Sequence, residues 1–199
     1  GNAVLAVLLS SQLSGTVDSA VQAKQAFPNP KIEIVDTLTT AMALGFTTLA
    51  AARAVQGGAD LAEAAQVARQ AVADSGVIFV VDTLEFMRRG GRIGGAAAFL
   101  GAALNMKPLL TLHEGKVEAL DKVRTKGKAV DRMLDLIEEQ IGSRRPLRIG
   151  TLPAAAEEEQ HEQSEHNLPA QLGNGEDDAN LFPHGSIRPI GVRGQRSEA

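Results

Sequence analysis

The chain has 199 residues, of which 44% are hydrophobic and 22% charged, as expected for a globular protein of one large or two small domains. The net charge of −4 and the absence of Trp and Tyr argue against a nucleic-acid-binding surface. Cysteine is absent, which excludes disulfides and thiolate metal sites. No stretch reaches the roughly 20 apolar residues that span a bilayer, and we expect a cytoplasmic protein.

Strand and helix patterns alternate through the first half of the chain, which predicts an α/β domain with a parallel sheet. The predicted elements are a strand over 3–9, a helix from an N-cap at Ser14 to about Ala26, a strand over 31–35, a helix over 39–56 closed by Gly57-Gly58, and a helix from Asp60 to about Asp74. Because the chain begins at Gly1, directly before the first strand, we expect that a preceding segment is absent from this sequence.

The second half has a different pattern. A strand over 77–81 leads to an amphipathic turn and a run with four glycines between Gly90 and Gly95. The elements predicted after it are a small-residue helix over 96–104, two strands over 107–112 and 116–120 joined at Glu114-Gly115, an amphipathic helix ending at Ile141, a strand over 147–152, an acidic helix over 154–163, and irregular chain from His166 onward.

Few residues form a recognisable catalytic pattern. The sequence has no nucleophile elbow, and His113, His161, His166 and His184 lack metal-ligand spacing. The Gly90–Gly95 run matches neither the Walker nor the dinucleotide-binding pattern. It could cradle a phosphate, but a structural turn is the simpler interpretation.

Two polar clusters are candidate binding sites. Hydroxyl groups gather at a strand end and helix start, where free N–H groups can hold a carboxylate or phosphate; these are Ser10, Ser11, Ser14 and Thr16. The alternative is that Ser14 only caps its helix. Basic side chains gather near residue 124, either as a docking site for an acidic or phosphate-bearing partner or as a solvated turn; these are Lys122, Arg124, Lys126 and Lys128.

Four long segments of the chain read SSQLSGTVDSA, IEIVDTLTTAMALG, DTLEFMRRGGRIGGAAAFLGAALNMKPLLTL and EGKVEALDKVRTKGKAV. Together they resemble the DegV family of bacterial fatty-acid-binding proteins, and the resemblance runs from Ala3 to Ala155. The resemblance implies an α/β fold of two lobes, a parallel-sheet lobe and a second lobe of sheet and helices. It predicts domain boundaries at 1–75, 76–155 and a poorly matched tail, 156–199.

The resemblance also implies a function and a set of residues. A long-chain fatty acid would lie in a buried apolar tunnel with its carboxylate held by Ser14, near the turn that contains Gly90, Gly91 and Arg92. The protein would have no catalytic residue and no cofactor. It would present the carboxylate to a fatty acid kinase, which forms an acyl phosphate for phospholipid synthesis, and Arg124 would engage the kinase or the phosphate.

The sequence departs from the family pattern at both ends. An early aspartate–serine strand and a carboxylate-binding threonine are absent, and Arg193 occupies the position of a family histidine. Two alternatives therefore stay open. One is a truncated family fragment with impaired ligand binding, and the other is a small-molecule enzyme that uses the Gly-rich turn for phosphate.

Overall fold

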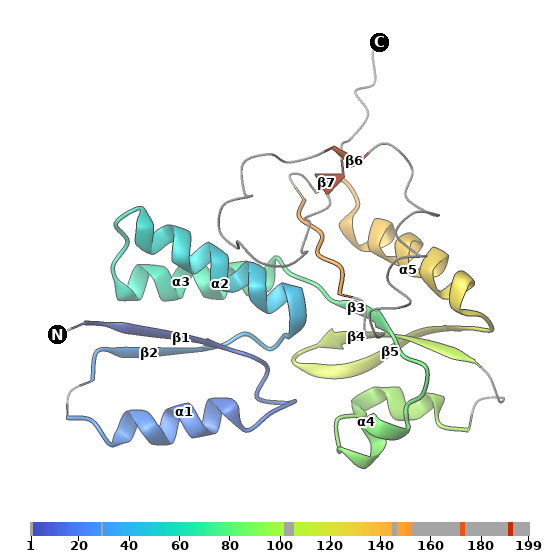
Figure 1. Ribbon diagram of the computed structural model, residues 1–199, viewed down its shortest axis with the longest axis horizontal. Coiled ribbons are helices and arrows are strands. Elements are labelled where there is room, and N and C mark those ends of the chain that lie inside the picture. Colours follow the sequence, from blue (N-terminus) through green and yellow to red (C-terminus); the bar gives the residue numbers. More distant parts are fainter. Residues whose placement is uncertain are drawn as a thin grey trace, which may run out of the picture. The chain divides into compact units, whose positions relative to one another are not determined.

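The computed structural model describes residues 2–28, 30–101, 106–144 and 147–152, together with two short backbone segments, 172–173 and 191–192. The chain divides into two compact units, Gly1–Ile141 and Gly142–Ala199 (Figure 1). The first unit contains a two-stranded sheet, a three-stranded sheet and all the candidate site residues described below.

The first sheet is parallel, as predicted. Strands β1 (Val4–Leu8) and β2 (Ile32–Asp36) pair in register from Val4↔Ile32 to Leu8↔Asp36. Helix α1 (Thr16–Gln25) connects the two strands, and helices α2 (Ala41–Gln56) and α3 (Leu61–Ala73) cover the opposite face (Figure 1). Small side chains let α2 and α3 approach the sheet closely, and the buried core here consists of Val35, Ala51, Ala65 and Ala68.

The ends of these helices follow local rules. As the sequence predicts, Asp60 caps α3, and α2 is closed by Gly57 as its C-cap, followed by Gly58 at φ +96°. The structure adds a reciprocal capping box between Asp60 and Glu63. The predicted cap at Ser14 is wrong. Helix α1 begins at Thr16 with Gly15 in the N-cap position, because Ser14 belongs to the preceding turn, where its N–H donates to the Ser10 carbonyl at 3.1 Å.

The second sheet is antiparallel, in the order β3-β4-β5, with strands β3 (Ile78–Val80), β4 (Lys107–His113) and β5 (Lys116–Val123). The predicted hairpin turn is confirmed: Glu114 and Gly115 both have positive φ, +48° and +81°, as a type I′ turn requires. Helix α5 (Lys126–Ile141) packs on the sheet through Ala129 and Leu136, which contact Leu109.

An ion pair ties α5 to β5. Arg132 Nε donates to the Asp121 carboxylate at 2.8 Å, and this hydrogen bond is the main reason that the pKa of Asp121 lies below its ordinary value. Arg132 also bonds Glu139 at 2.9 Å, so one guanidinium links the strand with two turns of its own helix.

Three predicted elements differ in the structure. The small-residue helix expected over 96–104 is instead a 3₁₀ helix, η1 (Gly94–Phe99), preceded by the short helix α4 (Glu85–Arg89); residues 102–105 lie outside the described residues. Within the predicted strand 147–152, Ile149 makes a single isolated bridge. In the tail expected to be irregular, β6 (Leu172–Gly173) pairs antiparallel with β7 (Gly191–Val192).

The remaining predictions for the C-terminal part cannot be compared with the structure. The acidic helix expected over 154–163, the histidines His161, His166 and His184, and Arg193 lie outside the described residues. The boundaries proposed after residues 75 and 155 stay predictions.

Candidate functional site

The segment Ser10–Gly15, which we call the serine loop, joins the end of β1 to the start of α1. Ser10 is fully buried, and its N–H donates to the Thr39 carbonyl at 2.9 Å. The Ser10 carbonyl in turn accepts the N–H groups of Leu13 and Ser14, at 3.0 and 3.1 Å, which closes the loop into a compact turn. Ser14 is half-buried at the end of this turn, next to the first residues of α1.

The hydroxyl of Ser14 has one neighbouring hydroxyl. Its Oγ lies 2.8 Å from Thr16 Oγ1, and either group can donate in this pair. The Thr16 N–H also donates to Ser14 Oγ, at 3.3 Å. When Thr16 is the hydroxyl donor, the Ser14 proton is available to a ligand, because an O–H group has one proton and two acceptor sites.

Asp36 fixes the start of the serine loop from the neighbouring strand. Its carboxylate accepts the N–H groups of Ser11 at 3.2 Å and Leu38 at 3.0 Å. Because β1 and β2 are parallel, their carboxyl ends meet at one edge of the sheet, which is where such sheets place binding groups. Leu38 has φ +49°, a strained value for a leucine, in the segment that follows.

The Gly-rich turn reaches the serine loop through Arg92. Arg92 Nε donates to the Leu13 carbonyl at 3.0 Å, and its Nη1 donates to the Gly90 carbonyl. Gly91 lies between Gly90 and Arg92 and has φ +73°, a left-handed conformation that glycine adopts readily and that reverses the chain at this point. The Gly-rich turn therefore contacts the serine loop at Leu13, the residue before Ser14. A shared site of Ser14, Gly90, Gly91 and Arg92 stays a prediction.

Gly94 and Gly95 occupy positions where the chain passes close to β5. A Cβ at Gly94 would overlap the carbonyl oxygen of Val117, and one at Gly95 would overlap the carboxylate of Glu118. Both glycines thus let η1 lie directly against β5, and Lys122 Nζ stacks 5.4 Å from the ring centre of Phe99 at the end of the same contact. These contacts favour the structural-turn interpretation of this run over a phosphate cradle.

An apolar cluster adjoins the polar loop. Its buried members come from the Gly-rich region and from β4 and β5, namely Leu84, Ala96, Leu110 and Val117. Leu13 of the serine loop packs against this cluster, together with the partly buried Phe79, Val81, Met87, Ile93, Phe99 and Leu112. The Ser14 hydroxyl and the hydrophobic cluster are thus one residue apart, an arrangement that suits a ligand with an apolar body and a polar end.

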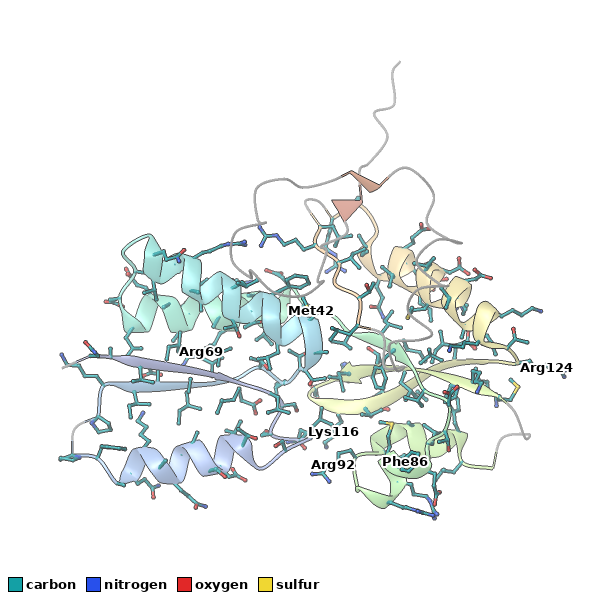
Figure 2. All side chains as sticks on the ribbon, in the orientation of Figure 1. Met42, Arg69, Phe86, Arg92, Lys116 and Arg124 are labelled. Atoms are coloured by element: carbon teal, nitrogen blue, oxygen red, sulfur yellow. The ribbon has the colours of Figure 1, made fainter. Side chains whose placement is uncertain are left out.

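Arg124 lies at the opposite end of β5 from the hairpin turn that meets the serine loop. It is exposed and follows the last residue of β5, whereas Lys116 begins that strand beside the hairpin turn (Figure 2). A strand of eight residues is about 27 Å long at ~3.4 Å per residue, so Arg124 and Ser14 cannot contact the same small head group in this structure.

Other kinds of site find no support in the described part of the chain. Within these residues, His, Asp and Glu side chains do not gather in groups of three that could hold a metal ion. The helices described there are also too short or too polar to cross a membrane.

The sequence did not predict how the serine loop is held. Ser10 belonged to the predicted hydroxyl cluster, but its partner could not be inferred. Ser10 Oγ donates to the carbonyl of Gly115, which is 105 residues away in the chain. The sequence signal nearest to this contact is Gly115 itself. A hairpin turn favours glycine at this position for its own geometry, so the glycine does not indicate a contact with Ser10.

Comparison with known proteins agrees with this architecture. A family model described as "Uncharacterised protein, DegV family" matches residues 1–187. A DegV domain-containing protein of Clostridium perfringens is 34% identical over 96% of this chain and 70% of its own length. A second one, from Streptomyces coelicolor, is 45% identical over 70% of this chain and 49% of its own length.

A solved structure extends the similarity to the fold. A fatty-acid-binding DegV family protein of Thermus thermophilus aligns with a TM-score of 0.65 and 39% identity, over 72% of this chain and 51% of its own. The chain thus spans about half the length of two of these three relatives. With a family match over residues 1–187 and the same mixed α/β fold, the chain belongs to the DegV family.

Proposed function

We propose that the chain contributes to a protein that binds a long-chain fatty acid. In this proposal the carboxylate lies at Ser14 and the acyl chain lies along the apolar cluster. The observation that carries the proposal is the junction of Leu13, which packs in the cluster, with Ser14, a half-buried residue just before α1 whose hydroxyl lies at the surface. The fatty-acid-binding relative from Thermus thermophilus supports the same ligand class.

The energetics suit a ligand of this shape. Each methylene removed from water contributes about 0.8 kcal/mol, so a long acyl chain supplies most of the affinity without many polar contacts. The Ser14 hydroxyl would donate to the carboxylate, and the N-terminus of α1, whose N-cap Gly15 has no side chain, adds favourable dipoles nearby. No general base is required, since binding involves no bond making or breaking.

Native mass spectrometry of the protein purified from a bacterial host tests this proposal. We expect one adduct of fatty-acid mass per chain, displaced by added oleate. A folded protein without an adduct that also fails to bind added oleate would contradict the proposal and favour the fragment interpretation. A polar, phosphate-containing adduct would instead support the small-molecule enzyme.

We further propose that the bound carboxylate is presented to a fatty acid kinase, which forms an acyl phosphate for phospholipid synthesis, and that Arg124 contacts the kinase. A partner that consumes ATP would place this function in the cytoplasm. Arg124 suits a partner contact because it is exposed, lies at the far end of β5 from the serine loop, and has basic neighbours at Lys122 and Lys128.

Replacing Arg124 by alanine should separate the two steps. We expect unchanged fatty acid affinity, because the side chain is remote from Ser14, and acyl-phosphate formation by a bacterial fatty acid kinase about tenfold slower at limiting kinase. Lys31→Ala, the same loss of charge at an exposed position before β2, serves as the control. Weaker lipid binding in the Arg124 variant would show that Arg124 is wrongly placed.

A further inference from the structure

We propose that Ser10 is a positioning residue, which holds the serine loop against the hairpin turn so that Ser14 is correctly placed for a carboxylate. This inference rests on the proposed fatty acid binding and names a residue that acts through the loop without touching the ligand. The contact joins the first sheet to the second, since Ser10 follows β1 and Gly115 lies between β4 and β5.

The hydroxyl of Ser10 is fully engaged. It donates to the Gly115 carbonyl at 2.8 Å and accepts the N–H of Gln12 at 3.1 Å, and the residue is 0% exposed. Its one proton is therefore committed to the hairpin, which excludes Ser10 as a direct ligand group. The same residue's carbonyl accepts the N–H of Ser14, so the position of Ser10 determines where the Ser14 backbone lies.

The hairpin side of the contact is equally close-fitting. Gly115 is buried, although it lies in a hairpin turn. A Cβ at this position would lie 2.5 Å from Ser10 Oγ, 3.0 Å from Leu38 Cδ2 and 3.1 Å from Gln12 Cγ. The turn therefore meets the loop with its bare backbone, and the paired strands β4 and β5 give it a fixed position.

The physical consequence concerns the head group alone. Without the Ser10 hydroxyl, the Gly115 carbonyl and the Gln12 N–H lose their partner, and the loop gains alternative conformations in which Ser14 no longer faces the carboxylate. The apolar cluster is built from other elements, apart from Leu13, and its contacts with an acyl chain stay in place. Loss of Ser10 should therefore lower carboxylate binding selectively.

The test compares an acid with its neutral analogue. For Ser10→Ala we expect affinity for oleate to fall about three- to tenfold, while affinity for oleyl alcohol changes less than twofold. Thr47→Val is the matched control, because Thr47 is also 0% exposed and its Oγ1 also donates to a main-chain carbonyl, that of Ala43, at 2.9 Å. That variant should keep the ratio of the two affinities unchanged.

Binding by the unmodified protein distinguishes a failure of the proposed function from a failure of the positioning role. If the unmodified protein binds neither ligand, fatty acid binding itself is wrong. If it binds oleate and Ser10→Ala loses acid and alcohol equally, or Thr47→Val changes the ratio as much, the positioning role is wrong.

Two further measurements test the same contact. Ser10→Cys keeps a weak donor of similar size and should fall between parent and alanine in the ratio. Amide hydrogen exchange of the unmodified protein should show protected N–H groups at Gln12 and Ser14, and rapid exchange at both would overturn the proposal.

Discussion

Replacing Ser14 by alanine is expected to weaken oleate binding by about ten- to a hundredfold, since a hydrogen bond to a charged group contributes ~1.5–3 kcal/mol. The side chain is half-buried and bonds only to Thr16, so its removal should leave the loop backbone in place. The carboxylate then has one donor fewer within a partly dehydrated site. Calorimetric titration with oleate measures the change directly.

The control for this variant lies on the same helix. Ser19→Ala removes an exposed hydroxyl that donates to the Gly15 carbonyl at 3.0 Å, and we expect no change in oleate affinity. Titration with oleyl alcohol should give equal affinities for the Ser14 variant and the parent. Equal oleate affinity in parent and Ser14→Ala would remove Ser14 from the site.

Replacing Gly94 by alanine should have the largest effect on stability. Its φ of +49° disfavours any side chain, and the new Cβ would overlap the carbonyl oxygen of Val117, the second residue of β5. Because a β-strand backbone cannot move without breaking its ladder, η1 would have to lift from β5. We expect the free energy of unfolding to fall by about 3 kcal/mol or more in urea titration.

Gly91→Ala isolates the conformational part of this cost. Gly91 also has positive φ, +73°, but a Cβ there would meet nothing within 4 Å. The expected loss is only about 1–2 kcal/mol, the usual cost of a left-handed conformation for alanine. Equal losses in both variants would contradict the close approach of η1 to β5. A stable Gly94 variant that had lost a phosphate ligand would revive the small-molecule enzyme.

Features that depend on neighbouring residues could be read from the sequence. The start of α3 needs only its cap at Asp60, the end of α2 needs only its two glycines, and the hairpin turn needs only Glu114-Gly115 between two apolar strands. Periodicity predicted the parallel pair β1 and β2, because buried parallel strands with intervening helices have a distinctive pattern. Ser14 was found as a hydroxyl before a helix, although its role as the N-cap was wrong.

Packing overrode local preference in the region after the Gly-rich turn. The run of alanines from Ala96 favours an α-helix by intrinsic propensity, and the sequence predicted one. The structure has a six-residue 3₁₀ helix there, since the segment lies so close to β5 that a Cβ at Gly94 would overlap the backbone of Val117. Propensity depends on neighbours along the chain, whereas this contact depends on a strand more than 20 residues later, from Val117 onward.

By itself, the sequence determined most of the elements before the Gly-rich turn, the family and the residue types of the candidate site. The tertiary structure alone decided which of those residues meet. It joined Ser10 to Gly115 across 105 residues and Arg92 to Leu13 across 79, and it left Arg124 at the opposite end of β5. The physical reason is that hydrogen bonds between distant segments depend on how two sheets dock, and no periodicity or cap along the chain records that geometry.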